Sequence, residues 1–460
     1  MGTVQPQQER RNTLSLWMLS WPIGIELLLQ FLMGAVDTGM VSRLGDDSVS
    51  AVGLSNQVIL SGMTLFSMIN AGIGVVIARK WGGERKDEAR RTSVLAVQAN
   101  AVMGLIASIV FLFGASSILR LMGTPDSVRP LAESYLSIVG ANTVIVLLHT
   151  VINTIVRNTG NTRSPMYVTL GMNGLHLALN YMLIFGVGMF LEMGIQGTAI
   201  STTISRIAAL AVSVLLLWHT FRPHWVAKEW LRLDRPLLRE VMQIGVPVSF
   251  TAISWGYSQV ILISVISSMG AASLAAYSYI QTIQQFIWVI AAALGTGLQI
   301  RIGQLYGAAK HGEVNKSLSR ATGVGVGLCL LVSAILFGMG EPILSLFTAD
   351  AGIKRICLPI LALFIGYQPL RVIGYCVSGS LNVVGEARFV AALSVFGMWA
   401  LTAGGAYVLG VTAGWGLMGA FVALVCDEVV RSAAFLIRWR RRSRALPASY
   451  GNQIREGLFR

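Results

Sequence analysis

Residues 21–41 read WPIGIELLLQFLMGAVDTGMV, and 225 positions later residues 246–266 read VPVSFTAISWGYSQVILISVI. Both stretches carry a proline at their second position, Pro22 and Pro247. Other residues recur at the same offset without a gap: Gly45 and Gly270, Gly82 and Gly307, Glu88 and Glu313, Gly160 and Gly385, Arg163 and Arg388, Arg206 and Arg431. The chain is therefore two copies of one unit, a duplication typical of membrane transporters.

The composition is that of a protein embedded in a lipid bilayer. Of the 460 residues, 54% are hydrophobic and 12% are charged, and the mean hydropathy is +0.66. Apolar stretches of about 20 residues, enough to cross a bilayer, are expected at 17–40, 50–78, 92–116, 131–155, 165–186, 196–218, 241–266, 273–300, 317–339, 356–382, 389–411 and 416–437. The short alternating pattern of a barrel is missing, which predicts an all-α polytopic membrane protein with twelve transmembrane helices.

The chain has a net charge of +14, and its basic residues are concentrated in the loops expected on one side of the membrane. Basic residues collect at 79–91, 157–163, 222–239 and 438–444, whereas the alternate loops carry few. This bias predicts cytoplasmic termini, and it argues against a nucleic-acid partner. We expect a cytoplasmic N-terminus (1–16), an amino-terminal lobe (17–218), a cytoplasmic linker (219–240), a carboxyl-terminal lobe (241–437) and a basic cytoplasmic tail (438–460).

Polar side chains inside these apolar segments require an explanation, because placing an ionisable group at membrane depth costs at least about 2.5 kcal/mol of free energy. They form three stripes: Glu26, Gln30 and Asp37; Asn142, His149 and Asn153; Asn173, His176 and Asn180. Hydrogen bonding between helices is the alternative explanation for the amides, but it is weaker for the carboxylate of Asp37. Position 262, opposite Asp37, is Leu, and position 405, opposite Asn180, is Gly. We therefore expect the ion chemistry in the amino-terminal half alone.

The run at 21–41, with its VDT core at 36–38, resembles the first helix of the multidrug and toxic compound extrusion family. Further stretches agree with that family: AVGLS at 51–55, GGERKDEAR at 82–90, RNTGNTRSP at 157–165, NYMLIFG at 180–186 and GIQGTAISTT at 194–203. The resemblance covers essentially the whole chain. It implies two six-helix lobes that form a V-shaped central cavity in a bacterial-type inner (cell) membrane. It also implies a NorM-like antiporter, expected as a monomer, that exports organic cations or amphipathic drugs in exchange for inward H⁺ or Na⁺.

The same resemblance implies roles for residues of the amino-terminal lobe. Asp37 matches the family's coupling carboxylate, and Gln30, Asn180 and Thr202 match polar members of its pocket. His176 stands where several relatives have asparagine, and a histidine can accept a proton near neutral pH. No resident cofactor is expected beyond the coupling ion, and Asp37 and Asn180 are the contacts that Na⁺ would use.

The carboxyl-terminal lobe departs from the family pattern. One branch of the family binds Na⁺ there with two carboxylates, but the corresponding positions hold Trp255 and Arg371, and an arginine repels cations. A substrate cavity is also expected. The carboxyl-terminal lobe contributes amides, aromatics and one arginine to it, namely Gln259, Tyr277, Gln281, Gln284, Trp288 and Arg371, and the amino-terminal lobe contributes Glu26. Ordinary helix packing or an aromatic belt is the alternative for the amides and aromatics. For Arg371 the alternatives are pairing with a carboxylate, contact with an anionic substrate, and a position at a membrane interface.

Three other classes of protein fit the sequence less well. A lipid-linked oligosaccharide or lipid flippase of the same superfamily would share both lobes, but a single Arg371 is thin support for the cationic cavity that it needs. An enzyme is not expected, because HExxH, GxSxG and phosphate-loop motifs are missing. A channel would not need a lone carboxylate in one of two repeats.

Overall fold

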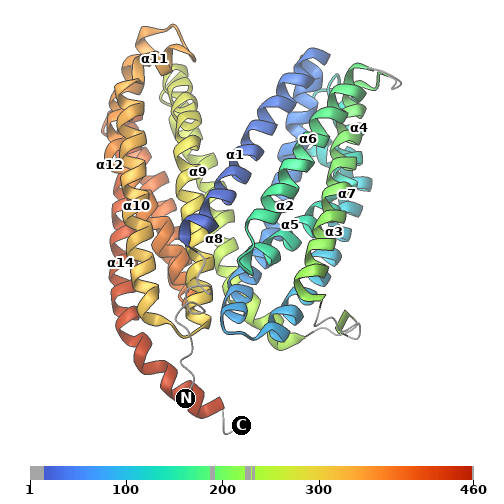
Figure 1. Ribbon diagram of the computed structural model, residues 1–460. Coiled ribbons are helices and arrows are strands. Elements are labelled where there is room, and N and C mark those ends of the chain that lie inside the picture. Colours follow the sequence, from blue (N-terminus) through green and yellow to red (C-terminus); the bar gives the residue numbers. More distant parts are fainter. Residues whose placement is uncertain (1–14, 187–191, 223–228, 231–233, 458–460) are drawn as a thin grey trace. The chain divides into compact units, whose positions relative to one another are not determined.

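The computed structural model describes residues 15–186, 192–222, 229–230 and 234–457, with side chains described except at 64–69 and 445–457. Of the expected segments, most of the N-terminus, much of the linker and the end of the tail lie outside the described residues. The rest is almost entirely helical (Figure 1), and the described residues contain no strand. The expected all-α class is confirmed.

Each expected span lies within a helix or bent helix, to within a residue at its ends. The first copy contains α1 (Leu16–Val41), α2 (Asp46–Gly82), α3 (Lys86–Leu121), α4 (Arg129–Ala141), α5 (Thr143–Asn158), α6 (Arg163–Phe185) and α7 (Gly194–Phe221), with a short helix η2 (Ser42–Leu44). The second contains α8 (Arg235–Ser267), α9 (Ala271–Gly307), α10 (His311–Gly338), α11 (Gly340–Ser345), α12 (Ala351–Val383), α13 (Ala387–Phe396), the π-helices η5 (Gly397–Gly404) and η6 (Ala406–Thr412), and α14 (Gly416–Gly457).

Nine helices of the described residues are long and apolar enough to span a membrane, or ten if α4 and α5, bent by 45° at their junction, count as one. The two remaining expected spans are α2 and α14, each of which includes residues whose side chains are not described. The layout is therefore consistent with twelve spans.

The backbone conformation repeats at the same 225-residue offset as the sequence. Gly45, before α2, has φ 104° and ψ 164°, and Gly270, before α9, has φ 102° and ψ 163°. Glu84 and Ala309, also 225 residues apart, both adopt left-handed φ values, 57° and 58°. Such values are uncommon for residues with a side chain, so their recurrence at matched positions is strong support for a duplicated fold.

The chain divides into two compact units. Ile25–Ser249 form one, the amino unit; residues up to Gly24 together with Phe250–Arg460 form the other, the carboxyl unit. Both boundaries lie inside helices, α1 and α8, and not in the 219–240 linker expected from the sequence. Ion pairs hold the described part of that linker to the amino unit: Glu229 pairs with Arg90 at 2.9 Å, and Glu240 pairs with Lys80 at 3.1 Å.

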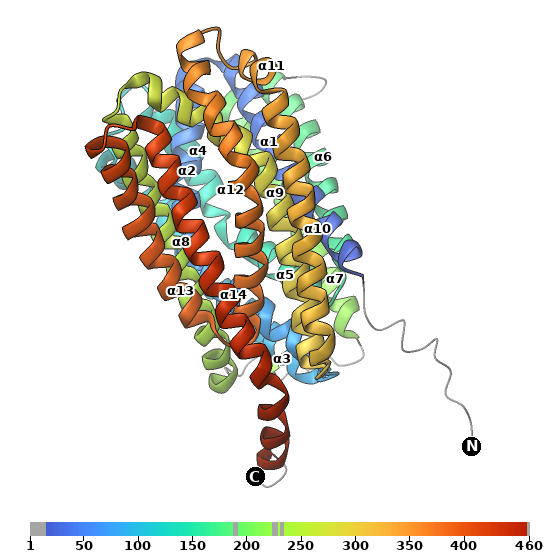
Figure 2. The same cartoon turned by 90° about the vertical axis from the view of Figure 1, so that its left-hand side faces the viewer.

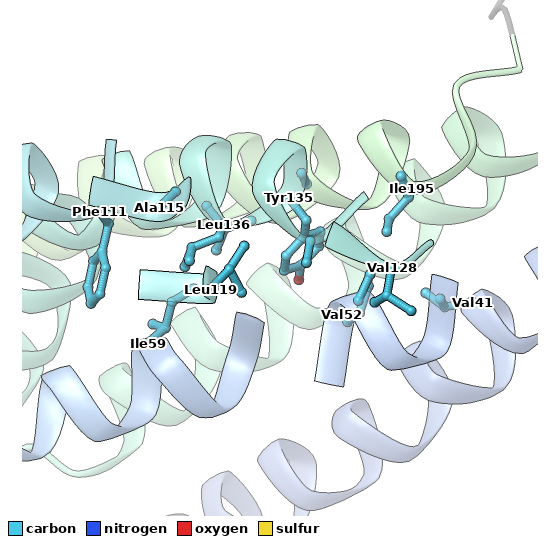
Figure 3. Close-up of a cluster of buried hydrophobic side chains, with 14 of the residues drawn as sticks. Val41, Val52, Ile59, Phe111, Ala115, Leu119, Val128, Tyr135, Leu136 and Ile195 are labelled. Carbon is cyan, nitrogen blue, oxygen red and sulfur yellow. The ribbon is translucent and has the colours of Figure 1, made fainter. Parts of the chain in front are cut away.

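The amino unit has a core made by α1, α2, α3, α4 and α7. Figure 3 shows this cluster, in which Phe111 and Leu119 of α3 and Tyr135 and Leu136 of α4 are among the labelled residues. Close packing supplies much of the stability of such a core, because lipid tails are as apolar as leucine and helix association gains little from the hydrophobic effect. The hydroxyl of Tyr135 is the one polar group displayed in this cluster (Figure 3).

In the carboxyl unit, α12 packs against α9, α10 and α14 (Figures 1 and 2). Aromatic rings fill the space between these helices. The ring of Phe421 lies 6.2 Å from that of Phe364 and 6.1 Å from that of Tyr277, and Phe364 lies 6.1 Å from Tyr367. These separations are within the range for favourable aromatic pairs.

We expect Gly45→Ala and Gly270→Ala each to lower stability by about 1–3 kcal/mol, because their φ and ψ values lie in a region that is almost restricted to glycine. Thermal unfolding of the purified protein in detergent measures the loss. Gly53→Ala is the matched control, since Gly53 is inside α2 and a Cβ there meets nothing within 4 Å. Equal unfolding temperatures for all three variants would contradict the prediction.

Candidate functional site

The carboxylate of Asp37, in the last turns of α1, is held by two side chains of α6. His176 Nε2 lies 2.9 Å from Asp37 Oδ1, and Asn180 Nδ2 donates to the same oxygen at 3.0 Å. The Asp37 side chain is 29% exposed and that of His176 is 8% exposed, while Asn180 is fully buried. One oxygen of the carboxylate is therefore bound by nitrogen donors from inside the protein.

This arrangement follows from helical periodicity. Residues 173, 176 and 180 lie along one face of α6, and the structure directs that face at α1. Asn173 Nδ2 donates at 3.5 Å to the carbonyl of Leu29, two turns before Asp37. The stripe expected from the sequence thus contacts a single neighbouring helix.

Ser201 of α7 completes the group, and the sequence analysis did not single it out. Its hydroxyl donates to Asn180 Oδ1 at 2.6 Å and lies 3.5 Å from His176 Nδ1. The carbonyl end of Asn180 is thereby occupied, which leaves the amide nitrogen for Asp37. The only available signal was that Ser201 adjoins the expected pocket residue Thr202.

Thr202 hydrogen-bonds to other residues than Asp37. Its hydroxyl donates to the carbonyl of Thr198 at 2.8 Å and hydrogen-bonds to Tyr135, which also bonds to Asn56. Arg206, one turn further along α7, interacts electrostatically with both Tyr135 and Asp37. A cation therefore contributes to the field around Asp37.

The other acidic and amide members of the first stripe are placed differently. Gln30 is exposed, and within the described residues no hydrogen bond joins it to Asp37 or its partners. Glu26 is 6% exposed, and Arg157 Nη2 donates to both of its carboxylate oxygens at 2.8 Å. Glu26, expected in a substrate cavity, is thus a buried carboxylate with its charge already balanced.

The stripe of Asn142, His149 and Asn153 hydrogen-bonds to α7. His149 Nδ1 lies 3.1 Å from Ser213 Oγ, Asn153 Nδ2 lies 3.0 Å from His149 Nε2, and Ser213 donates back to Asn153 at 3.1 Å. Asn142 donates at 3.1 Å to Thr203. These contacts match the alternative of helix-to-helix hydrogen bonding, so we assign this stripe a structural role.

Of the expected cavity residues in the carboxyl unit, Gln281 donates to the Tyr277 hydroxyl, and Trp288 donates at 3.1 Å to the hydroxyl of Tyr375. Gln259 is half-buried, and Gln284 has a buried oxygen without a hydrogen-bond partner in the described chain. These side chains lie on α8, α9 and α12 and form local pairs rather than one cluster.

Arg371 stacks on an aromatic ring. Its guanidinium carbon lies 5.5 Å from the ring centroid of Tyr367, a separation at which a cation is attracted to the ring face. This contact gives the positive charge a partner inside the carboxyl unit.

The sequence predicted ion chemistry in the amino-terminal half alone, but the carboxyl unit also holds buried carboxylates that the prediction did not include. On α14, Asp427 and Glu428 are 2% and 5% exposed, and both pair with Arg431, at 2.9 Å and 2.7 Å. The repeat gave no sign of these acids, because Thr202 and Thr203 stand at the matched positions of the other copy. The fold permits them because Arg431 supplies a partner one turn away.

Within the part of the chain that is described, no three His, Cys, Asp or Glu side chains group as a metal site would require. Asp37 and Asn180, named above as Na⁺ contacts, do lie together, but the amide nitrogen faces the carboxylate. The geometry thus presents hydrogen-bond donors, not additional oxygen ligands, to Asp37 Oδ1.

We expect Glu26→Gln to lower stability by about 3–5 kcal/mol, because removing one partner leaves the Arg157 charge, whose side chain is only 20% exposed, without compensation. The double variant Glu26→Gln/Arg157→Gln should recover part of that loss. Thermal unfolding in detergent measures both. The control is Asp126→Asn, which breaks the pair with Arg129 in which the Asp126 side chain is 91% exposed, and an exposed pair contributes at most about 1 kcal/mol. A similar effect at both pairs would contradict this view of Glu26.

Comparison with known proteins places these features in a family. The MatE family model matches residues 22–182 and 247–408, one match in each copy. The uncharacterized transporter YisQ of Bacillus subtilis is 32% identical over 431 residues, covering 94% of this chain and 95% of YisQ. The probable multidrug resistance protein NorM of Bacillus cereus is 22% identical, covering 92% of this chain and 94% of NorM.

Solved structures share the fold. A structure described as an outward-facing conformation of a multidrug resistance MATE family transporter has a TM-score of 0.84 at 23% identity, covering 94% of this chain and 96% of that one. The MatE match includes both repeat prolines and extends over most of each copy. The chain is therefore a member of the MatE family of membrane transporters.

Proposed function

We propose that this protein is a secondary active antiporter that exports small organic cations or amphipathic compounds in exchange for inward H⁺ or Na⁺. The observation that carries the proposal is the Asp37 carboxylate, held at 2.9 Å and 3.0 Å by His176 and Asn180 inside a membrane protein. Relatives named as probable multidrug resistance proteins support the substrate class. We place the protein in a cell membrane with both termini in the cytoplasm, from the loop charges.

Coupling requires that the ion bind one conformation better than the other. When Asp37 is ionised, the donors of α6 compensate its charge and draw α1 toward α6. When an ion neutralises Asp37, those contacts lose much of their strength, because hydrogen bonds to charged groups are roughly twice as strong as neutral ones. Occupancy of Asp37 therefore biases the position of α1 against α6, and the ion gradient supplies the work.

The donor set favours H⁺ over Na⁺ as the coupling ion. Na⁺ would need several oxygen ligands, whereas the side chains directed at Asp37 Oδ1 present nitrogen, and the Asn180 oxygen already accepts from Ser201. A proton needs only one carboxylate oxygen, and both nitrogen donors from the described part of α6 bond to Oδ1 of Asp37 rather than to Oδ2.

The aromatic and amide side chains of the carboxyl unit suit an amphipathic cation. Trp288 and Tyr375 offer ring faces that attract positive charge, with the Tyr375 hydroxyl beside them. The flippase alternative is not favoured, since Arg371, the residue that suggested it, lies over Tyr367. No enzymatic role is proposed.

We expect Asp37→Asn to abolish uphill efflux, with at least a tenfold loss of gradient-driven rate, because asparagine cannot take up the coupling ion. Efflux of ethidium from proteoliposomes, with an imposed H⁺ or Na⁺ gradient tested singly, measures this. Asp47→Asn is the matched control, since Asp47 is exposed at the start of α2 and should keep the parent rate.

Efflux by the parent that follows only the H⁺ gradient would support H⁺ as the coupling ion, and efflux that follows only Na⁺ would reject it. Transport by Asp37→Asn at the parent rate would remove Asp37 from the mechanism. No efflux by the parent under either gradient would reject export of this substrate class.

A further inference from the structure

Two adjacent carboxylates, Asp427 and Glu428, are buried within the carboxyl unit on α14, which lies beside α12 and α13 (Figure 2). Neither has a role in the antiport mechanism described above. Ionisable side chains in such segments are costly and usually functional, so their charges need to be accounted for.

One arginine serves both carboxylates. Arg431 Nη2 lies 2.9 Å from Asp427 Oδ2 and 2.7 Å from Glu428 Oε2. From α12, Tyr367 interacts with all three groups, and Arg371 on the same helix faces Tyr367. From η5 comes only a hydroxyl, that of Thr402. The single guanidinium between the two acids balances one negative charge and leaves the other to be neutralised.

The two oxygens of Asp427 have different surroundings. Oδ2 accepts from Thr402 at 3.1 Å and from Arg431. Oδ1 is buried and has no hydrogen-bond partner among the described residues. It lies against the backbone of Gly397, where a Cβ atom would come within 2.1 Å of it. A charged oxygen without a donor is far more expensive to bury than a neutral carboxyl, so the enclosure of Oδ1 suits a protonated side chain.

We infer that Asp427 is a second proton-binding site, in the carboxyl unit, which takes up H⁺ on Oδ1 while Glu428 stays paired with Arg431. The proton comes from water and forms one O–H bond, and its release to water restores the carboxylate, so no other reactant is needed. Within the described residues no three His, Cys, Asp or Glu side chains gather as a metal site would require, whereas H⁺ needs a single oxygen.

The duplication supports this position independently. Asp427 and Arg431 stand 225 residues after Thr202 and Arg206, which belong to the polar layer next to Asp37. The same face of the last helix therefore carries polar or ionisable groups in both copies. Gly397 and Thr402, which enclose Asp427, belong to the π-helix η5, and π-helical segments are frequent at functional sites.

The existence of this site does not depend on the proposed function, but any part that it plays in coupling rests on it. The test therefore measures protonation without transport. Infrared difference spectroscopy of the full-length protein in lipid nanodiscs, recorded as the pH is lowered, detects the C=O stretch of a newly protonated carboxyl. The Asp37→Asn background removes the contribution of the first site.

In that background we expect a titrating carboxyl band that Asp427→Asn removes and that the neighbouring control, Glu428→Gln, retains. Asp427→Asn keeps the size of the side chain and an oxygen that can accept from Thr402. Should this variant not fold, Thr402→Val in the same background decides the question. It removes the hydroxyl that bonds to Asp427, so the frequency of the band should shift.

Absence of any titrating band, a band that persists in Asp427→Asn, or a band lost only in Glu428→Gln would overturn the assignment to Asp427. An unchanged frequency in Thr402→Val would do the same. The spectra measure protonation and not transport, so a failed efflux assay does not change their interpretation. The proton-binding site and the antiport proposal can therefore be rejected separately.

Discussion

The charge of Asp37 imposes a constraint on three helices of the amino unit. A carboxylate in an apolar helix must be compensated from within the protein, and its donors come from His176 and Asn180, one turn apart on α6. Ser201 then fixes the orientation of Asn180 from α7. Because the donors have fixed spacing, they define where α1 lies along α6. The packing of these helices and the state of one titratable group are thereby coupled.

The two copies have kept a common backbone and changed its chemistry. The glycines before α2 and α9 have nearly the same φ and ψ values, so the loops that set helix direction have been preserved. The carboxylates have not been preserved at matched positions: the amino unit carries Asp37 on α1, where the carboxyl unit has Leu262, and the carboxyl unit carries Asp427 on α14, where the amino unit has Thr202. A shared scaffold thus holds two different ionisable clusters.

Helix positions could be predicted from the sequence because span length and repeat offset are properties of the chain alone. The face of α6 that meets α1 was likewise evident from its period. Partners were harder to predict. Arg157, which neutralises Glu26 from 131 residues away, was interpreted as a loop charge. Asp427 was missed because the matched position in the other copy holds Thr202, so the repeat gave no sign of an acid there. Ser201 gave no signal of its own, since serine in a helix usually bonds to its own backbone, as Ser201 also does at 3.0 Å.

Energetics give a reason for a protein of this kind to have a titratable group in each unit. Moving a two-state equilibrium from 1:99 to 99:1 requires about 5.5 kcal/mol of differential binding. A single charge inside a membrane-spanning helix costs about 2.5–3.5 kcal/mol on the insertion scale, so one neutralised carboxylate would fall short of that shift even if the whole cost differed between the two conformations. The partners of Asp37 lower its cost further, because they compensate the charge. A second proton-binding group, as inferred for Asp427, would add to the shift only to the extent that its affinity for H⁺ also differs between the two conformations.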